Sequence, residues 1–333
     1  MVPGRHHLYF HAPCFDGITS AALLHDFLRH HEGADSVELH TANYHLNPTW
    51  AQLELAAPAS VVDFLYHPDA EIWFDHHPTT FLSPAFERDF ASRRSSRRAY
   101  EPVATSCSLF LWRHLFDAFG FRIEAMAEKV FAADRIDSAR YESAAEALFS
   151  AAPALRINAS LAVGETDEYS KRLVRAFLVD SLAEIAGSAE VSAKYRQYQG
   201  LRDLGLQRFV AGAHLESDGI VVFVVDGAGA LVNRYAPFYY FPDAPYSLGV
   251  VYDGKSGKIT AMRNPWLSFE SVPLGQIMAR FGGGGHQRVG STRVNAASPE
   301  DAGKLMPRIL GALRDAWRTQ RRERPHDGAL QLL

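Results

Sequence analysis

The chain has 333 residues, of which 47% are hydrophobic and 22% are charged, and its formal net charge is −4 at pH 7. This length is typical of two domains, and the hydrophobic fraction is large enough to form a sizeable core. The negative charge argues against a protein that coats duplex DNA, but it is compatible with a short nucleotide held in a cleft.

The two cysteines, Cys14 and Cys107, form no disulfide framework and favour a reducing compartment. Residues 1–7 lack the basic and apolar regions of a signal peptide. No run approaches the roughly 18 apolar residues of a transmembrane helix. We therefore expect a cytoplasmic protein without a membrane partner.

The first half of the chain alternates short apolar runs with stretches of helical periodicity. Strands are predicted over residues 7–11, 36–42, 60–64 and 71–75. Helices are predicted over residues 16–30, 48–56, 102–119 and 123–133. This alternation predicts an α/β fold with a doubly wound, mostly parallel sheet. The basic segment 88–98 is interpreted either as a solvated loop or as a mobile loop that helps to hold an anionic substrate.

A charged, helical stretch from Asp167 to Arg202 predicts a helical linker between two domains. Beyond it, strands over 219–225, 246–252 and 257–262 and helices over 273–280 and 298–319 predict a second, smaller α/β domain. A polar tail is expected over 320–333. We place the first domain at 1–165, the linker at 166–210, the second domain at 211–310, and the end of the last helix with the tail at 311–333.

Side chains that can bind metal stand at the ends of three predicted strands. They are His11 with Asp16 just beyond it, Asp63, and the run Asp75-His76-His77. Because ligands bind outside the carboxyl ends of parallel strands, we expect these side chains along one rim of the sheet. Imidazole with carboxylate suits Mn²⁺, Mg²⁺, Zn²⁺ or Fe²⁺, and a pair of ions would hold the attacking and leaving oxygens of a phosphate ester.

Two nearby positions each allow two interpretations. Cys14 is either a soft metal ligand in the place of an oxygen ligand or a small buried residue in a tight turn. Ser106 lies in the run ATSCS, which opens an apolar helix. That run is either a plain helix cap or a helix N-terminus directed at a phosphate.

The second half contains a run of four glycines, Gly282 to Gly285, followed by His286. Such a run lets the backbone approach a ligand closely and presents N–H groups to an anion, so we predict that Gly284, Gly285 and His286 bind substrate. The alternative is a flexible hinge or a long turn. Arg263 is either a surface residue or a guanidinium that holds a phosphate with two hydrogen bonds.

In this order, the segments resemble the motifs of the DHH phosphoesterase superfamily, which includes RecJ-like exonucleases, small-RNA nucleases, cyclic-dinucleotide phosphodiesterases and family II inorganic pyrophosphatases. The name-giving motif resembles Asp75-His76-His77, the first motif resembles HAPCFDGITSAA from His11, and the second resembles VVDF with Asp63. The fourth resembles Asp137-Ser138-Ala139-Arg140-Tyr141, with Asp134 as the alternative. Gly282 to His286 and Arg263-Asn264 resemble the DHH-associated C-terminal domain. The resemblance spans roughly residues 5–295.

The resemblance implies one or two divalent ions, Mn²⁺ first, with Mg²⁺, Fe²⁺ or Zn²⁺ as alternatives. The implied ligands are His11, Asp16, Asp63, His76 and Asp137, with Asp63 as the bridge. His77 would face the substrate, and Asp75 would be a ligand or would orient the histidines. Arg263, Gly284, Gly285 and His286 would bind substrate from the second domain. Many members have an aspartate where this chain has Cys14, so it resembles a cysteine-containing subgroup in which one metal site is weaker.

The resemblance thus implies an enzyme in which metal-activated hydroxide hydrolyses phosphodiester or phosphomonoester bonds of short nucleotides, namely oligoribonucleotides or linear or cyclic dinucleotides. The glycine–histidine motif favours nucleotides over bare pyrophosphate, because the pyrophosphatases use a different C-terminal domain. Two alternatives stay open: a nucleotide-binding or regulatory protein with weakened catalysis, motivated by Cys14, and a polyphosphate hydrolase. The expected partner is a short nucleotide or oligonucleotide, and a homodimer is compatible with the sequence.

Overall fold

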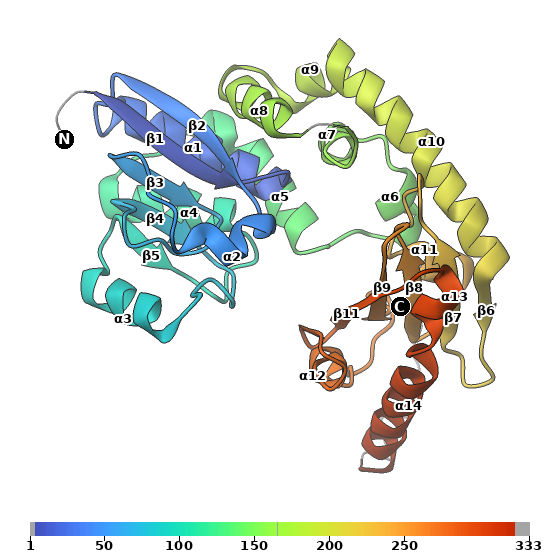
Figure 1. Cartoon of the computed structure of the whole chain (residues 1–333). Helices are drawn as coiled ribbons and strands as arrows, with labels where there is room; N and C mark the ends of the chain where they lie inside the picture. The colour runs from blue at the N-terminus through green and yellow to red at the C-terminus, as the bar shows by residue number, and fades with distance from the viewer. Residues whose placement is uncertain (1–3, 165, 324–333) are drawn as a thin grey trace. The chain divides into compact units, whose positions relative to one another are not determined.

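The computed structural model describes residues 4–164 and 166–323, and the chain divides into two compact units (Figure 1). The first unit comprises Met1–Tyr141 and Ala151–Gln197, and the second comprises Glu142–Ser150 and Tyr198–Leu333. The boundary falls inside one long helix, α10 (Ala189–Gly212), and the short helix α6 (Ala144–Phe149) belongs to the second unit. The domain limits at 165, 210 and 310 stay predictions from the sequence.

The first unit is built on a five-stranded parallel sheet in the order β2-β1-β3-β4-β5. Its strands are β1 (Arg5–His11), β2 (Ser36–Ala42), β3 (Ala59–Val62), β4 (Ile72–Asp75) and β5 (Arg98–Tyr100). In β1, Leu8 and Phe10 are fully buried, whereas the alternating residues His7 and His11 are half-buried on the other side. The doubly wound parallel sheet predicted from the sequence is confirmed.

Hydrophobic clusters form on both faces of this sheet. The central helix α1 (Phe15–His30) is buried over most of its length and packs on β1, α4 (Cys107–Phe119), α5 (Ala127–Asp137) and α8 (Asp167–Val179). The other cluster contains Trp50 and Trp73, whose indole N–H groups donate to backbone carbonyls. The remaining helices are η1 (Tyr44–Leu46), α2 (Asn47–Trp50), α3 (Pro84–Arg93), η2 (Glu124–Met126), α7 (Pro153–Ser160) and α9 (Leu182–Gly187).

The basic segment 88–98 is largely helix and strand, so neither loop interpretation is right. Ser83 caps α3 and Pro84 occupies its first turn, which starts the helix ahead of the basic run. Arg93 donates to the carbonyl of Pro68, and Arg98 donates to the carbonyl of Ala70. These arginines therefore tie the segment to the first unit.

The second unit contains a six-stranded mixed sheet in the order β10-β11-β9-β8-β7-β6, in which only β7 and β8 pair in parallel. Its strands are β6 (Ala213–Leu215), β7 (Val221–Asp226), β8 (Tyr246–Tyr252), β9 (Ser256–Arg263), β10 (Gly284–Gly285) and β11 (Val289–Asn295). Its other helices are α11 (Ala236–Tyr240), α12 (Leu274–Ala279), α13 (Pro299–Gly303) and α14 (Met306–Glu323). The expected second α/β domain is confirmed, and residues 324–333 of the predicted tail lie outside the described residues.

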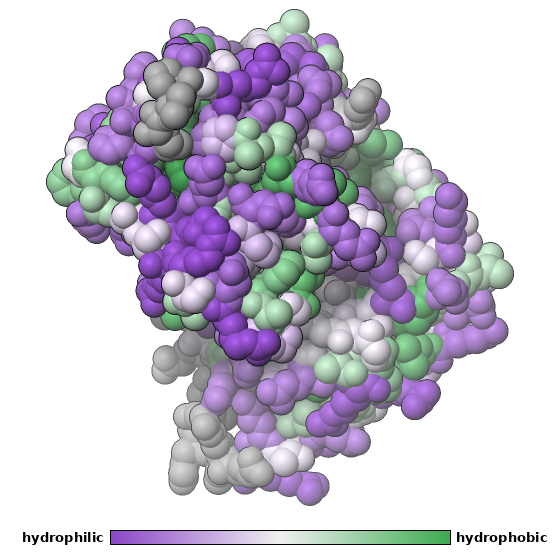
Figure 2. All heavy atoms as spheres, turned by 60° about the vertical axis from the view of Figure 1, so that its left-hand side comes forward, coloured by the Kyte–Doolittle hydropathy of each residue, from purple (hydrophilic) through white to green (hydrophobic). Residues whose placement is uncertain are grey.

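Among residues 4–164 and 166–323, no helix combines the length and the apolar character needed to cross a bilayer. On the face drawn in Figure 2, hydrophobic side chains appear as separate small patches between hydrophilic ones. The large apolar side chains are instead gathered in the clusters around the two sheets.

Candidate metal centre

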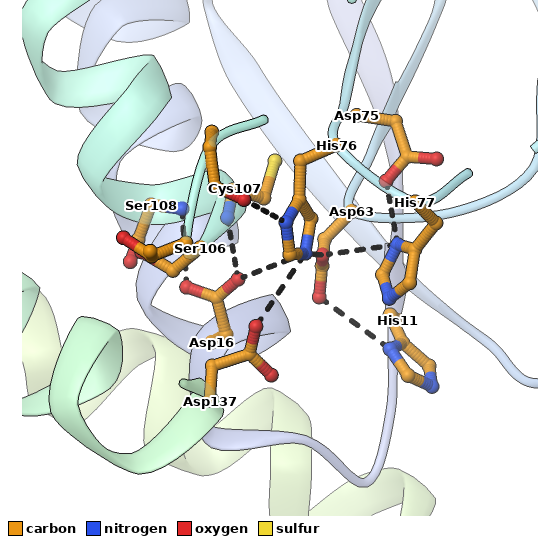
Figure 3. A network of polar contacts seen from close by, with 12 residues as sticks. His11, Asp16, Asp63, Asp75, His76, His77, Ser106, Cys107, Ser108 and Asp137 are labelled. Carbon is orange, nitrogen blue, oxygen red and sulfur yellow. Dashed lines mark hydrogen bonds and ion pairs between the residues drawn. The ribbon is translucent and has the colours of Figure 1, made fainter. Parts of the chain in front are cut away.

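Polar side chains from several segments of the first unit, some buried and some partly exposed, converge at the carboxyl ends of its strands (Figure 3). They are His11 at the end of β1, Asp16 in the first turn of α1, Asp63 directly after β3, Asp75 at the end of β4, His76 and His77 just beyond it, and Asp137 at the end of α5. The parallel topology causes this meeting, because every strand of the sheet delivers its last residue to the same edge.

Asp63 lies at the middle of this group and is 1% exposed. Its Oδ2 is 3.4 Å from His11 Nδ1, and its Oδ1 is 3.6 Å from His76 Nε2. Neither carboxylate oxygen has a hydrogen-bond partner among the described residues. A buried carboxylate without hydrogen bonds is costly, so its environment is the one that a cation would satisfy.

His76 directs one ring nitrogen at the carboxylates. Its Nδ1 is 3.1 Å from the carbonyl oxygen of Ala104, which can only accept, so Nδ1 carries the hydrogen. Its Nε2 lies 3.5 Å from Asp137 Oδ2 and 4.0 Å from Asp16 Oδ2, and it has no hydrogen-bond partner among the described residues. A metal-binding histidine is characteristically held in this way, with its second nitrogen bonded to a carbonyl.

Asp75 orients His77. The Asp75 carboxylate is fully buried and accepts a hydrogen bond of 2.8 Å from His77 Nδ1. Burial opposes protonation of His77, but this hydrogen bond and the charges of Asp75 and Asp63 outweigh burial and raise the pKa of His77 to about 9. Without a bound ion, these interactions favour the protonated form of His77. Asp75 belongs to none of the ligand groups described below, so the geometry favours the orienting role over the metal-ligand role.

Asp16 is held by the N-terminus of α4. Its Oδ2 accepts from the backbone N–H of Cys107 at 2.7 Å, and its Oδ1 accepts from that of Ser108 at 3.0 Å. Burial and the neighbouring charges of Asp63 and Asp137 raise the pKa of Asp16. The free N–H groups of the helix thus bind a carboxylate of this chain, which argues against a helix N-terminus directed at substrate phosphate.

The predicted contact between Ser106 and substrate is not what the geometry supports. Ser106 is fully buried, its hydroxyl oxygen accepts from the N–H of Leu109 at 3.2 Å, and its hydroxyl donates to Asp134 Oδ1 at 3.2 Å. Ser106 is therefore a helix cap, the simpler of its two interpretations.

The structure distinguishes the two aspartates considered for the fourth motif. Asp134 accepts hydrogen bonds from Thr105, Ser106 and Arg140, which occupy its carboxylate. Asp137 instead faces His76, and 30% of its side chain is exposed. Burial and the charge of Asp63 raise the pKa of Asp137 to about 6. The structure thus brings Asp137, not Asp134, to the centre.

Cys14 is the residue that precedes α1, and its side chain makes no capping hydrogen bond. Its sulfur lies close enough to His11 and Asp63 to share an ion with them. Burial and the charges of Asp63 and Asp16 raise the pKa of the Cys14 thiol well above its usual range. The position of Cys14 beside His11 and Asp63 fits the soft-ligand interpretation, whereas the raised pKa favours the neutral thiol, so both interpretations stay predictions.

Three overlapping groups of side chains at this centre could hold a metal ion. They are His11 with Cys14 and Asp63, Asp63 with His76 and His77, and Asp16 with His76 and Asp137. Within each group the ligand atoms lie within 4.8 Å of one another. Asp63 and His76 each belong to two groups. Together with the unpartnered atoms of Asp63 and His76, this donor set of oxygen, nitrogen and one sulfur fits divalent cations.

Sequence reasoning missed Tyr44, which follows β2 at the same rim. Its ring centroid lies 5.0 Å from that of His11 and 6.3 Å from that of His77, and Tyr44 is 41% exposed. Tyr44 lies outside every motif. Its position in the sequence could have identified it, because an aromatic residue just after a parallel strand reaches the same edge of the sheet as the other strand ends.

In the second unit, the Arg263 guanidinium is hydrogen-bonded to the loop that follows it in the chain. It is 6% exposed and donates to the backbone carbonyls of Asn264, Leu267 and Phe269. Its guanidinium also lies 4.3 Å from the ring centroid of Phe269. These bonds leave little of the guanidinium free, which argues against the phosphate-binding role predicted for Arg263.

The second half of the glycine run is part of the sheet, whereas Gly282 lies in a turn. Gly284 and Gly285 form β10, which pairs with β11, and the N–H of His286 donates to the carbonyl of Val289 at 2.7 Å. Gly285 has a φ of 143°, and a Cβ added there would lie 2.4 Å from the carbonyl oxygen of Val289, so only glycine fits. Gly285 and His286 are exposed, and their contact with substrate stays a prediction.

The chain matches no known family profile and no curated protein. Solved structures resemble it along most of its length. A pGpG-specific phosphodiesterase from Vibrio cholerae has a TM-score of 0.67 and 18% identity, covering 93% of this chain and 99% of its own. An exopolyphosphatase-related protein from Bacteroides fragilis has a TM-score of 0.55 and 14% identity. The match covers 95% of this chain and 94% of that protein. The DHH domain of a member of the s1p family of ribosomal proteins has a TM-score of 0.55 and 11% identity. The match covers 93% of this chain and 86% of that domain.

At these identities the likeness concerns the fold. The chain shares the fold of these structures, one of which is described as a DHH domain, and the resemblance drawn from its sequence motifs is confirmed at the level of the fold.

Proposed function

We propose that this protein is a metal-dependent phosphoesterase that hydrolyses ester bonds of short nucleotides at the centre around Asp63. One observation carries the proposal: the two oxygens of a fully enclosed carboxylate face two different imidazoles and have no hydrogen bond among the described residues. A carboxylate with one oxygen directed to each side can bridge the two ions of a two-metal hydrolytic centre. The superfamily fold supports the same assignment.

In this proposal Asp63 bridges two positions. One ion would be held by His11 and Cys14, and the other by Asp16, His76 and Asp137. When bound, divalent ions supply Lewis-acid polarisation of the phosphoryl group and a water of lowered pKa. Mn²⁺ is the ion that we propose first, because it accepts both imidazole and carboxylate. Cys14 offers a soft donor where a carboxylate would suit such an ion better, so the position beside His11 is the weaker one.

The remaining polar groups of the centre act on the substrate. His77, whose protonated form Asp75 favours, donates a hydrogen bond to a phosphoryl oxygen or to the leaving oxygen. Tyr44 presents a half-exposed ring beside it, on which a nucleobase can stack. From the second unit, Gly284, Gly285 and His286 are proposed to contact the substrate.

The substrate class that we propose to test first is a linear dinucleotide. The Vibrio cholerae protein is described as pGpG-specific, and the likeness covers nearly the whole of both chains. Polyphosphate is the second candidate, because the Bacteroides fragilis protein is described as exopolyphosphatase-related.

The test uses the full chain with Mn²⁺ and separates products by chromatography. Its substrates are pGpG, a cyclic dinucleotide, oligoribonucleotides of increasing length and polyphosphate. We expect mononucleotides to be released from the dinucleotide, and no release by Asp63→Asn. Asp117→Asn, an exposed carboxylate on α4, is the matched control and should behave as the wild type. Phosphate released only from polyphosphate would support the second candidate, and nucleotide binding without turnover with any ion would overturn the enzyme assignment.

A further inference from the structure

Three side chains outside the catalytic centre converge on the first sheet of the molecule. His7 lies on β1, and Glu38 and His40 lie on the edge strand β2. In the parallel register His7 is opposite Glu38, and His40 is two residues further along β2. Because side chains of alternate residues in a strand point to the same face, Glu38 and His40 share the face that His7 occupies on the neighbouring strand.

The three side chains stand at the spacing of metal ligands. His7 Nδ1 is 3.0 Å from His40 Nε2 and 3.8 Å from Glu38 Oε2, and His40 Nε2 is 3.9 Å from Glu38 Oε1. Ligand atoms around a tetrahedral zinc ion, each about 2.0–2.1 Å from the metal, lie roughly 3.3 Å from one another. One atom from each side chain can be chosen so that all three lie within 4.8 Å of one another, so small rotations of the side chains would bring two ring nitrogens and one carboxylate oxygen to one ion without a change in the backbone.

Neighbouring residues hold these ligands in place. The Tyr9 ring stacks on His40 with 4.5 Å between the ring centroids, which fixes the plane of the imidazole. Arg5 Nη1 lies 3.2 Å from Glu38 Oε2, which restrains the carboxylate. The two imidazole nitrogens that face each other at 3.0 Å share at most one hydrogen when both rings are neutral. Neutral imidazole is the form that binds metal.

We propose that His7, Glu38 and His40 form a second metal site, which binds a zinc ion through two imidazoles and one carboxylate and leaves the fourth position to water. Two histidines and one glutamate are an established ligand set for zinc. The site is separate from the catalytic centre, because His7 precedes His11 by four residues of extended strand, which span ~13 Å. An ion there would link the edge strand β2 to β1 and stabilise the first unit. This inference does not depend on the proposed phosphoesterase activity.

The test counts zinc ions on the full chain by competition with a chromogenic chelator. Because the proposed catalytic centre could also hold zinc, the titration is made in an Asp63→Asn, His76→Ala background, which removes a ligand from each of the three groups at that centre. We expect that background protein to bind one zinc ion, and the same protein with His7→Ala and His40→Ala to bind at least about tenfold more weakly. His45→Ala, an exposed histidine just beyond β2, is the matched control and should leave the zinc affinity unchanged.

A second measurement guards against a loss of fold. Without metal, Glu38→Gln should unfold at nearly the same temperature as the wild type, because it keeps the size of the side chain. Added zinc should raise the unfolding temperature of the wild type by more than that of Glu38→Gln. Equal zinc affinity and equal thermal shifts in the altered and unaltered proteins would overturn the proposal. So would an Asp63→Asn, His76→Ala protein that binds no zinc.

Discussion

Two buried polar residues, Asp63 in the first unit and Arg263 in the second, both lie in segments that resemble DHH motifs, but their surroundings are opposite. Both oxygens of Asp63 are without hydrogen bonds among the described residues. Arg263 donates to three backbone carbonyls and lies over the ring of Phe269. Buried polar groups are nearly always paired, so an unpaired group indicates a ligand and a fully paired group indicates a structural role. A motif alone does not separate the two cases.

The strongest test of this contrast is Asp63→Asn. The amide keeps the shape of the side chain and tolerates the left-handed backbone at this residue, where φ is 57°. It removes the charge that bridges the two proposed ions, a loss of several kcal/mol in the transition state. We expect kcat/KM for the dinucleotide to fall by about 10³-fold or more. Near wild-type turnover would show that the metal assignment is wrong, and circular dichroism would check that the fold is kept.

Asp75→Asn tests whether Asp75 acts through His77. Without the carboxylate, His77 loses the hydrogen bond and the charge that raise its pKa to about 9. We expect kcat/KM to fall by roughly 10–100-fold, as for other residues that orient a metal-site histidine. The activity profile should also lose its alkaline side at a lower pH than in the wild type. An unchanged pH profile with the same loss of activity would mean a purely structural role.

Arg263→Met tests the other half of the comparison. Methionine keeps an apolar chain against Phe269 but leaves the carbonyls of Leu267 and Phe269 without their donor. Each buried unpaired group costs about 1–3 kcal/mol, so we expect the free energy of unfolding to drop by ~2–5 kcal/mol. Denaturant unfolding measures this loss. Arg288→Met, at an exposed arginine, is the control. A large rise in KM for the dinucleotide without loss of stability would restore the phosphate-binding role.

His25→Gln tests whether an unpaired buried group outside the metal centre affects stability alone. His25 Nδ1 is buried and has no hydrogen-bond partner among the described residues, but it lies on α1 outside the ligand groups of the centre. Burial, with the charge of Arg29 as the next cause, lowers the pKa of His25 to about 4. The unfolded chain therefore binds a proton near pH 6.5, whereas the native protein does not bind it until about pH 4.

The stability that neutral His25 contributes is complete above pH 6.5 and is lost as the pH falls toward 4. We expect the drop in unfolding temperature between pH 7 and pH 5 to be smaller in His25→Gln by roughly 2–4 °C. Activity at neutral pH should not change. His30→Gln, at an exposed histidine of the same helix, should keep the wild-type drop. If His25→Gln abolished activity instead, position outside the ligand groups would not distinguish a buried unpaired nitrogen that affects only stability from one that is needed for activity.

Much of the centre was predictable because its residues stand where strands end. His11, Asp63 and Asp75 follow or close apolar runs, and alternation of strands and helices implies a parallel sheet whose strand ends meet. The start of α4 also has a local cause, since Ser106 caps the helix. Ser83 caps α3 in the same local way, although the segment 88–98 was interpreted as a loop. These features depend on neighbours within a few residues, which the sequence shows directly.

The tertiary structure alone decided which polar groups are already paired. Asp16 accepts from the N–H groups of Cys107 and Ser108, 91 and 92 residues further along the chain. Asp134 is occupied by Thr105 and Arg140, which leaves Asp137 to face His76. Residue types and spacing are the same whether such a bond forms or not, because its partner is set by packing between distant segments. The sequence therefore determined the fold class and the rim of candidate ligands, and the packing decided which of them are free to bind.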